Sequence, residues 1–160
     1  MTEQEIRVFI NGASKYFKTV AASPAEIGTP FLKEPADRII SDFSAIIGIT
    51  GVHRGCVYYT APRSMVQKLV KELGETDISD DMCADFVGEI ANTISGNARE
   101  HLGKNFLISV PVVLRGQPEA IRFPNDVATF VIPVLWDGHR SSLIVCLKDE
   151  EPLSMNGSVS

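Results

Sequence analysis

Three polar side chains recur at helical spacing in the middle of the chain. Asp85, Glu89 and Asn92 are four and then three positions apart, so in a helix they share one face. Hydrophobic residues between positions 86 and 102 also recur every three or four positions, which predicts that the polar face is opposite the buried one. Carboxylates and carboxamides facing solvent can make polar contacts with another molecule. If the chain carries chemistry, we expect it on this helix.

The composition of this stripe, defined as Asp85, Glu89, Asn92 and Gly96, is unfavourable for a helix. A mid-helix glycine costs about 1 kcal/mol relative to alanine, and asparagine is also a poor helix former. Gly88 and Gly96 flank the polar side chains, and glycines leave a helix backbone open to close approach by another body. The pattern indicates a binding surface, with a tolerated helix face of no special role as the alternative.

The remaining sequence offers little that could be catalytic. GxSxG, HExxH and phosphate-loop motifs are absent. The three histidines lack metal-ligand spacing: His53, His101 and His139. The three cysteines lack CxxC spacing and are expected to be buried, reduced thiols: Cys56, Cys83 and Cys146. We therefore predict no metal site and no cofactor bound by this chain.

Three helices are expected from the hydrophobic periodicity. One covers residues 2–20, and a long one runs from about 80 to Leu102 and ends at Gly103. Between them, a helix begins after Pro62 and stops at Gly74. The residues expected on its buried face are Met65, Leu69, Val70 and Leu73.

Extended segments surround these helices. Residues 38–50 and 53–60 predict one hairpin, and residues 126–136 and 139–147 predict another around Asp137-Gly138. Three prolines leave a loop or edge strand over residues 21–35, and residues 105–116 form a further strand in which Pro111 indicates an edge or bulge. A helix followed by a hairpin thus occurs twice, which indicates an internal pseudo-repeat.

The composition is that of a soluble globular domain. With 160 residues, of which 44% are hydrophobic and 22% charged, the chain can bury a core. We predict one α+β domain over residues 1–150, with long helices packed in two layers on a largely antiparallel sheet, and a disordered tail over 151–160.

Charge and hydropathy exclude several partners. The net charge of −5, with no basic cluster, argues against nucleic acid or an anionic membrane surface. The N-terminus lacks the basic start and apolar core of a signal peptide, and no apolar run is long enough to span a bilayer. We expect a cytoplasmic protein.

The stripe resembles the signature of the chemotaxis phosphatase family that includes CheC, CheX and the phosphatase part of FliY. In that signature an aspartate or serine, a glutamate and an asparagine have the spacing of Asp85, Glu89 and Asn92, and a proline follows, here Pro111. The gap of eighteen residues between Asn92 and Pro111 is a few residues shorter than the family pattern. The segments GEIANTISGNA, HLGKNFLISVPVV and IIGITGVHRGCVYYTAP are also similar, most of all to CheX, so the resemblance covers about residues 38–148.

The resemblance implies a CheC-like fold and an enzyme that hydrolyses the aspartyl phosphate of a CheY-like receiver domain. Glu89 would pair with a lysine of the receiver, and Asn92 would hold a water in line with phosphorus, so both are candidate catalytic residues. Four residues are candidates for contact with the partner: Asp85, Gly88, Gly96 and Arg99. Mg²⁺ would be held by the receiver, and the family implies a homodimer.

Two other functions stay open from the sequence. The chain can be a non-catalytic module that binds a receiver through the same stripe, or a structural domain. The presence of both Glu89 and Asn92 favours the phosphatase over the structural domain, because a structural helix needs neither residue at an exposed site.

Overall fold

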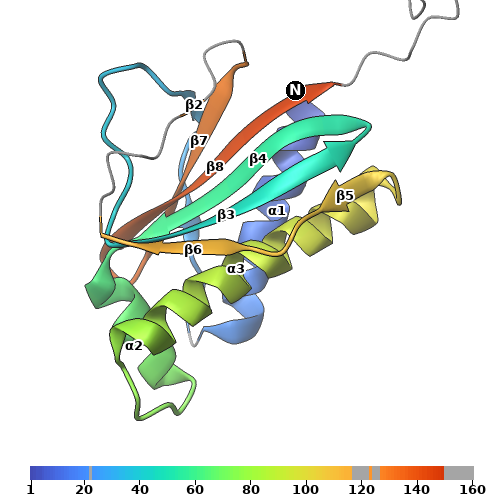
Figure 1. Cartoon of the computed structure of the whole chain (residues 1–160). Helices are drawn as coiled ribbons and strands as arrows, with labels where there is room; N and C mark the ends of the chain where they lie inside the picture. Colours follow the sequence, from blue (N-terminus) through green and yellow to red (C-terminus); the bar gives the residue numbers. More distant parts are fainter. Residues whose placement is uncertain (22, 117–122, 124–126, 150–160) are drawn as a thin grey trace, which may run out of the picture.

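Three helices lie on one face of an eight-stranded antiparallel sheet in the computed structural model, which describes residues 1–21, 23–116, 123 and 127–149 (Figure 1). This confirms the predicted two-layer α+β class. The tail predicted to be disordered, residues 151–160, lies outside the described residues.

The helices lie where the sequence predicts them. They are α1 (Glu3–Val20), α2 (Arg63–Glu72) and α3 (Asp80–Leu102). Gly74 and Gly103 follow α2 and α3 with φ of +86° and +104°, a left-handed conformation that glycine adopts without a steric penalty. The prediction for Leu73 is wrong: it caps α2 and is 46% exposed, because the helix ends one residue earlier and the chain turns away from the core.

The strands follow the predicted hairpins, with two differences. They are β1 (Glu26–Ile27), β2 (Phe31–Leu32), β3 (Phe43–Gly51), β4 (His53–Ala61), β5 (Phe106–Ile108), β6 (Val112–Arg115), β7 (Thr129–Trp136) and β8 (His139–Asp149). The first hairpin starts at Phe43 rather than at residue 38. The strand predicted over 105–116 is broken into β5 and β6, because Pro111 has no N–H to continue the ladder.

The sheet order reveals the predicted pseudo-repeat. The strands run β1-β7-β8-β4-β3-β5, with β2 also beside β7 and β6 also beside β3. Each hairpin, β3–β4 or β7–β8, therefore has two short strands on its outer side. The short strands that follow α1 pair with the second hairpin, and those that follow α3 pair with the first. The order is symmetric about the central β4–β8 pair, so α1 and α3 hold equivalent places in the topology.

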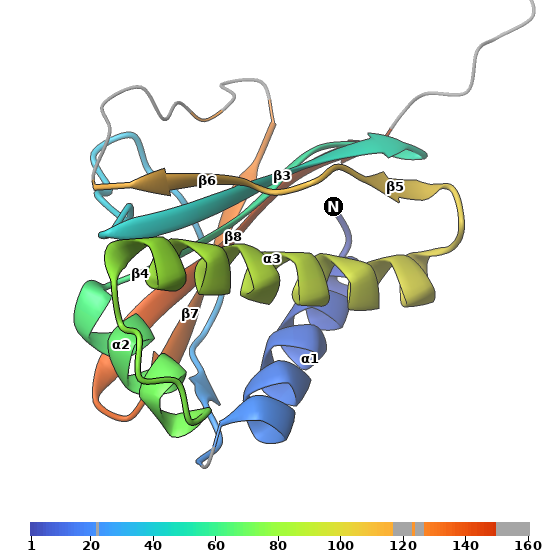
Figure 2. The same cartoon turned by 60° about the horizontal axis from the view of Figure 1, so that its bottom comes forward.

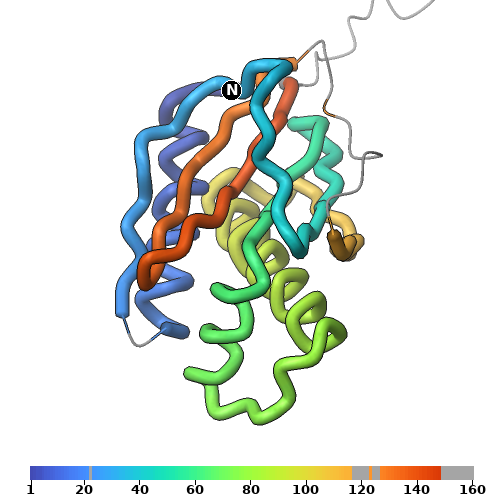
Figure 3. The backbone as a smooth tube through the Cα atoms, turned by 90° about the vertical axis from the view of Figure 1, so that its left-hand side faces the viewer, coloured from blue at the N-terminus to red at the C-terminus, as the bar shows by residue number. Residues whose placement is uncertain are grey.

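The main core lies between the sheet and the helices. Phe17 of α1 packs against Trp136 of β7 with ring centroids 6.5 Å apart, and Phe9 packs against Phe106 of β5 at 6.4 Å. Figure 3 shows α1 lying behind β7 and β8. The buried side of α3 includes Ile90 and Ile94, both fully buried. Each helix thus covers one half of the sheet and leaves its outer face free.

Candidate functional site

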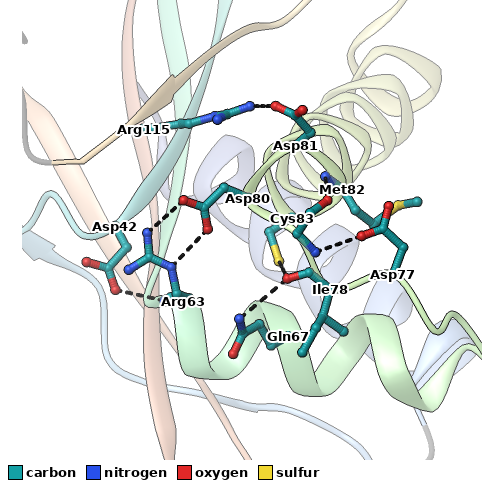
Figure 4. Close-up of polar contacts among 11 residues, drawn as sticks. Asp42, Arg63, Gln67, Asp77, Ile78, Asp80, Asp81, Met82, Cys83 and Arg115 are labelled. Carbon is teal, nitrogen blue, oxygen red and sulfur yellow. Dashed lines mark hydrogen bonds and ion pairs between the residues drawn. The ribbon is translucent and has the colours of Figure 1, made fainter.

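The first turn of α3 is held by side chains from two other elements (Figure 4). The Arg63 guanidinium of α2 donates to both carboxylate oxygens of Asp80, at 3.0 and 3.1 Å, and it lowers the pKa of the Asp80 carboxyl. Arg115 of β6 forms an ion pair with Asp81. The Ser79 hydroxyl accepts from the Met82 N–H at 3.3 Å, which caps the helix. These contacts fix the start of α3 one turn before Asp85.

The predicted stripe lies on the outer face of α3. Asp85, Glu89 and Asn92 are all exposed, and Gly96 is half-buried. Arg99, one turn further, is exposed as well. The structure therefore brings the candidate catalytic residues onto one solvent-facing helical row, as the spacing predicted.

The two flanking glycines have different surroundings. A Cβ at Gly96 would meet no atom within 4 Å, whereas a Cβ at Gly88 would lie 3.0 Å from Val113 Cγ2 of β6. Gly88 is buried. The sequence predicted that another molecule would approach the backbone at Gly88, but β6 of this chain occupies that position. The prediction of an open backbone is therefore wrong for Gly88. It holds for Gly96.

Glu89 and Asn92 form a ridge between two hollows. On one side, a hollow of about 380 Å³ is lined by Asp85, Gly88, Glu89, Asn92, Pro111 and Val113. Pro111 therefore reaches the stripe, since its Cγ lies 3.8 Å from the position of a Gly88 Cβ. The shorter gap before Pro111 leaves the proline beside the motif helix.

On the other side of the ridge, a groove separates α3 from α1. Figure 2 shows α3 running between α1 and the β5–β6 edge. The groove has a volume of about 770 Å³, and the same Glu89 and Asn92 side chains line it. Tyr16 of α1 lines it as well and is nearly buried. Burial raises the pKa of the Tyr16 hydroxyl, and the negative charge of Glu89 raises it further, so the phenol stays neutral.

The α1 side of this site was missed by the sequence analysis. Its contribution comes from a helix about seventy residues earlier in the chain, and hydrophobic periodicity alone does not say which helices touch. One signal was available: Gly12 is a mid-helix glycine, and a Cβ there would lie 3.0 Å from Asn97 Nδ2 of α3. Gly12 lets the two helices approach closely and sets the depth of the groove.

No other cluster in the described part of the chain competes with this ridge. Within that part, no three metal-ligating side chains come together. His53 pairs with Glu5, and His101 Nδ1 lies 2.9 Å from the Asn97 carbonyl oxygen. The three cysteines form no disulfide with one another: Cys83 and Cys146 are buried and Cys56 is half-buried. None of the helices described is long and apolar enough to cross a membrane.

Comparison with known proteins identifies the family. The family model described as chemotaxis phosphatase CheX matches residues 43–135, which span β3 to β7 and include all of α3. The chain belongs to the CheX family. CheX proteins are chemotaxis phosphatases by that description, and the ridge on α3 falls inside the matched region. A sequence comparison with curated proteins finds no match.

Solved structures of CheX proteins share the fold. CheX from Desulfovibrio desulfuricans is 26% identical, with a TM-score of 0.78 over 91% of this chain and 99% of the other. CheX from Vibrio vulnificus is 22% identical, with a TM-score of 0.80 over 91% and 99%. CheX in a complex with CheY, BeF₃ and Mg²⁺ from Borrelia burgdorferi is 23% identical, with a TM-score of 0.76 over 91% and 98%.

Proposed function

We propose that this CheX-family phosphatase hydrolyses the aspartyl phosphate of a CheY-like receiver domain in chemotaxis or related two-component signalling. The observation that carries the proposal is the ridge: Glu89 and Asn92 are exposed on a fixed helix between two hollows. A protruding polar ridge can enter a shallow site on a partner. The CheX–CheY complex from Borrelia burgdorferi supports a receiver as that partner.

Asn92 is the residue that we assign to the reaction. Its carboxamide oxygen accepts a hydrogen bond and its amide nitrogen donates one, so one side chain can hold a water in a fixed direction. The water oxygen attacks phosphorus, the bond between phosphorus and the aspartate oxygen breaks, and inorganic phosphate leaves. The aspartate carboxylate is regenerated, and the proton of the water passes to the phosphate or to solvent. Positioning is the contribution expected of a protein in phosphoryl transfer.

Glu89 anchors the helix in this proposal. One turn before Asn92, its exposed carboxylate would pair with a lysine of the receiver. Asp85 is a further turn away and supports the interface, together with Arg99 and the open backbone at Gly96. The Mg²⁺ that neutralises phosphoryl oxygens belongs to the receiver. The proposed reaction needs no metal ligand from this chain.

The decisive experiment follows the decay of a phosphorylated CheY-type receiver. The receiver is phosphorylated with acetyl phosphate, the donor is removed, and loss of phosphate is timed with and without this protein. Removing one preorganised polar group costs about 3–4 kcal/mol of transition-state stabilisation, so Asn92→Ala should lower the rate by two to three orders of magnitude. His101→Ala, at an exposed position of the same helix that lines neither hollow, is the matched control and should keep the rate.

Two outcomes would count against the assignment. If Asn92→Ala decreases only the affinity for the receiver and leaves the maximal rate unchanged, Asn92 binds rather than catalyses. If wild-type protein binds several receivers without accelerating the decay of any, the chain is a receiver-binding module and the phosphatase proposal fails.

We also propose a cytoplasmic homodimer. The CheY-like substrate proposed above supports a cytoplasmic location. The β5–β6 edge exposes three apolar side chains, Leu107, Val110 and Val112, with Val110 83% exposed, and open strand edges of this kind favour pairing with a second chain. Sedimentation velocity measures the assembly directly, and a monomer at micromolar concentration would contradict the proposal.

A further inference from the structure

The groove between α1 and α3 is larger than the catalytic ridge requires. Its volume is about 770 Å³, roughly twice that of the hollow beside Pro111, at about 380 Å³. Its floor and walls come from α1, the end of α2 and α3, and the two catalytic candidates lie along one side. A receiver that receives Glu89 and Asn92 in its active site must therefore also lie over this groove.

One cation lies in the groove. Lys15 of α1 is exposed and is the single basic residue among the described residues that line it, together with the acidic residues Glu89 and Glu100. Lys15 makes no ion pair with any described residue, whereas Lys68 of α2 pairs with Asp137 and Arg63 with Asp80. An ammonium group without a partner at the rim of a docking site is available to a carboxylate of another molecule.

Exposed apolar surface lies at the same groove. Leu73, which the sequence placed in the core, is 46% exposed and lines the groove beside Val20. Phe86 of α3 contributes to the wall and is almost buried. Burial of an exposed leucine contributes about 1.5–3 kcal/mol when it is complete. The groove therefore offers an apolar contact as well as a cation.

We infer that the α1–α3 groove is a second docking site for the receiver, in which Lys15 binds a carboxylate on the receiver's surface and Leu73 covers an apolar side chain beside it. This inference rests on the proposed function and adds the specificity of that same site. The occupant is a receiver segment with an acidic residue next to an apolar one.

Charge supports this occupant over others. The chain carries a net charge of −5, and the ridge itself presents Asp85 and Glu89 to a receiver whose phosphorylated site is acidic. Like charges would slow the approach of two such surfaces. A cation placed beside the ridge offsets this repulsion at the point of contact. Lys15 is therefore expected to act on association and affinity rather than on the chemical step.

The test reverses the charge of Lys15 and compares it with a matched lysine. Lys15→Glu is measured against Lys18→Glu, because Lys18 is exposed on the same helix and does not line the groove. Initial rates are followed against the concentration of a receiver phosphorylated with acetyl phosphate. We expect Lys15→Glu to raise KM about 5- to 10-fold at low salt with kcat unchanged, and Lys18→Glu to change KM by less than about twofold.

Salt and a charge swap sharpen the test. At 0.5 M salt the effect of Lys15→Glu should shrink toward that of Lys18→Glu, since screening removes interactions between exposed charges. Receiver variants that change each carboxylate around the phosphorylation site to lysine are then paired with Lys15→Glu. One of them should restore KM, which would identify the residue that Lys15 binds. Leu73→Ser should also raise KM about threefold or more without a change in kcat.

The outcomes separate this inference from the proposed function. If wild-type protein fails to accelerate dephosphorylation, the proposed function itself fails. If wild type is active and the two lysine variants have the same KM, the docking site is overturned while the phosphatase stands. If Lys15→Glu lowers kcat and Lys15→Arg does not restore KM, Lys15 is not a docking residue. Circular dichroism of each variant shows that it is folded.

Discussion

The two long helices hold equivalent places in the sheet topology, yet their exposed residues differ in composition. The first turns of α1 carry helix-stabilising features: a capping box between Thr2 and Glu5 and an ion pair from Glu3 to Arg7. The outer face of α3 carries residues that weaken a helix, among them Asn92 and Gly96. The start of α1 is composed for stability, whereas the stripe of α3 is composed for contact.

This difference shows how a site can be placed on a repeated architecture. The core side of both helices is occupied by apolar residues that pack on the sheet. What differs is the solvent side, where residue choice is free of packing. An unfavourable choice on a free surface is therefore informative, because nothing in the fold requires it. The comparison predicts that changes on α3 affect activity and that core changes on α1 affect stability.

Phe17→Ala and Asn92→Ala should differ most in their effects on stability and on activity. Phe17 is fully buried against Trp136, so its truncation should lower the free energy of unfolding by about 3–5 kcal/mol. The rate of dephosphorylation per folded Phe17→Ala molecule should change little. Asn92→Ala should instead lower that rate and leave the free energy of unfolding nearly unchanged. Urea denaturation measures the first effect and receiver dephosphorylation the second.

Lys18→Ala is the control for Phe17→Ala, because it alters the adjacent exposed residue of α1 and should change stability by less than about 0.5 kcal/mol. A large loss of kcat in folded Phe17→Ala protein would break the comparison. It would mean that the packing of α1 sets the geometry of the ridge on α3.

A smaller effect distinguishes the two glycines of α3. Gly96→Ala should stabilise the protein by about 0.5–1 kcal/mol, because alanine favours a helix and the added methyl meets no atom. Gly88→Ala should gain less, since its methyl would lie 3.0 Å from Val113 Cγ2, a contact that Val113 must relieve by moving. In a Val113→Ala background the two substitutions should become equal.

Thermal and urea unfolding of the five variants, namely the three single and the two double substitutions, measure this cycle. If Gly88→Ala and Gly96→Ala stabilised the protein equally in the wild-type background, Val113 of β6 would move at no cost and Gly88 would not be required for packing. Gly96→Ala also tests whether the receiver approaches the helix backbone at this position. If it does, the added methyl should raise KM for the receiver while the stability of the protein rises.

Local signals made much of this fold predictable. The ends of α3, with Ser79 before it and Gly103 after it, and the Asp137-Gly138 turn depend on residues close in sequence. The exposed stripe followed from rotation along one helix. The site is less completely predicted, because Pro111 and the groove residues of α1 reach α3 only through tertiary packing.

The same reason explains the errors. A glycine in a helix indicates close approach, but the sequence does not say by what, and at Gly88 the answer is β6 of the same chain. Leu73 matched the apolar spacing of α2, yet the helix ended before it. In both cases the helical spacing was correct, but spacing does not show which part of the molecule packs against a given residue.

The smallest expected effect is a pH dependence at the start of α1. Burial acts to raise the pKa of the Glu5 carboxyl, but hydrogen bonds from Thr2 and the nearby His53 outweigh it and lower the pKa below its usual value. A lowered pKa in the folded state means that the ionised carboxylate stabilises the fold. That contribution is complete above the unfolded pKa, about 4.3, and is lost as pH falls through the lower folded pKa.

Glu5→Gln isolates this charge, because glutamine can still close the capping box but cannot pair with His53 as an anion. The substitution should cost about 1 kcal/mol or less at pH 6, and the difference from wild type should shrink as pH falls below the unfolded pKa. Urea denaturation between pH 3 and 6 measures it, with kcat for the receiver unchanged. A difference in stability that stayed constant over this range would assign the role of Glu5 to its shape rather than its charge. A change in kcat would show that the start of α1 also affects the reaction on α3.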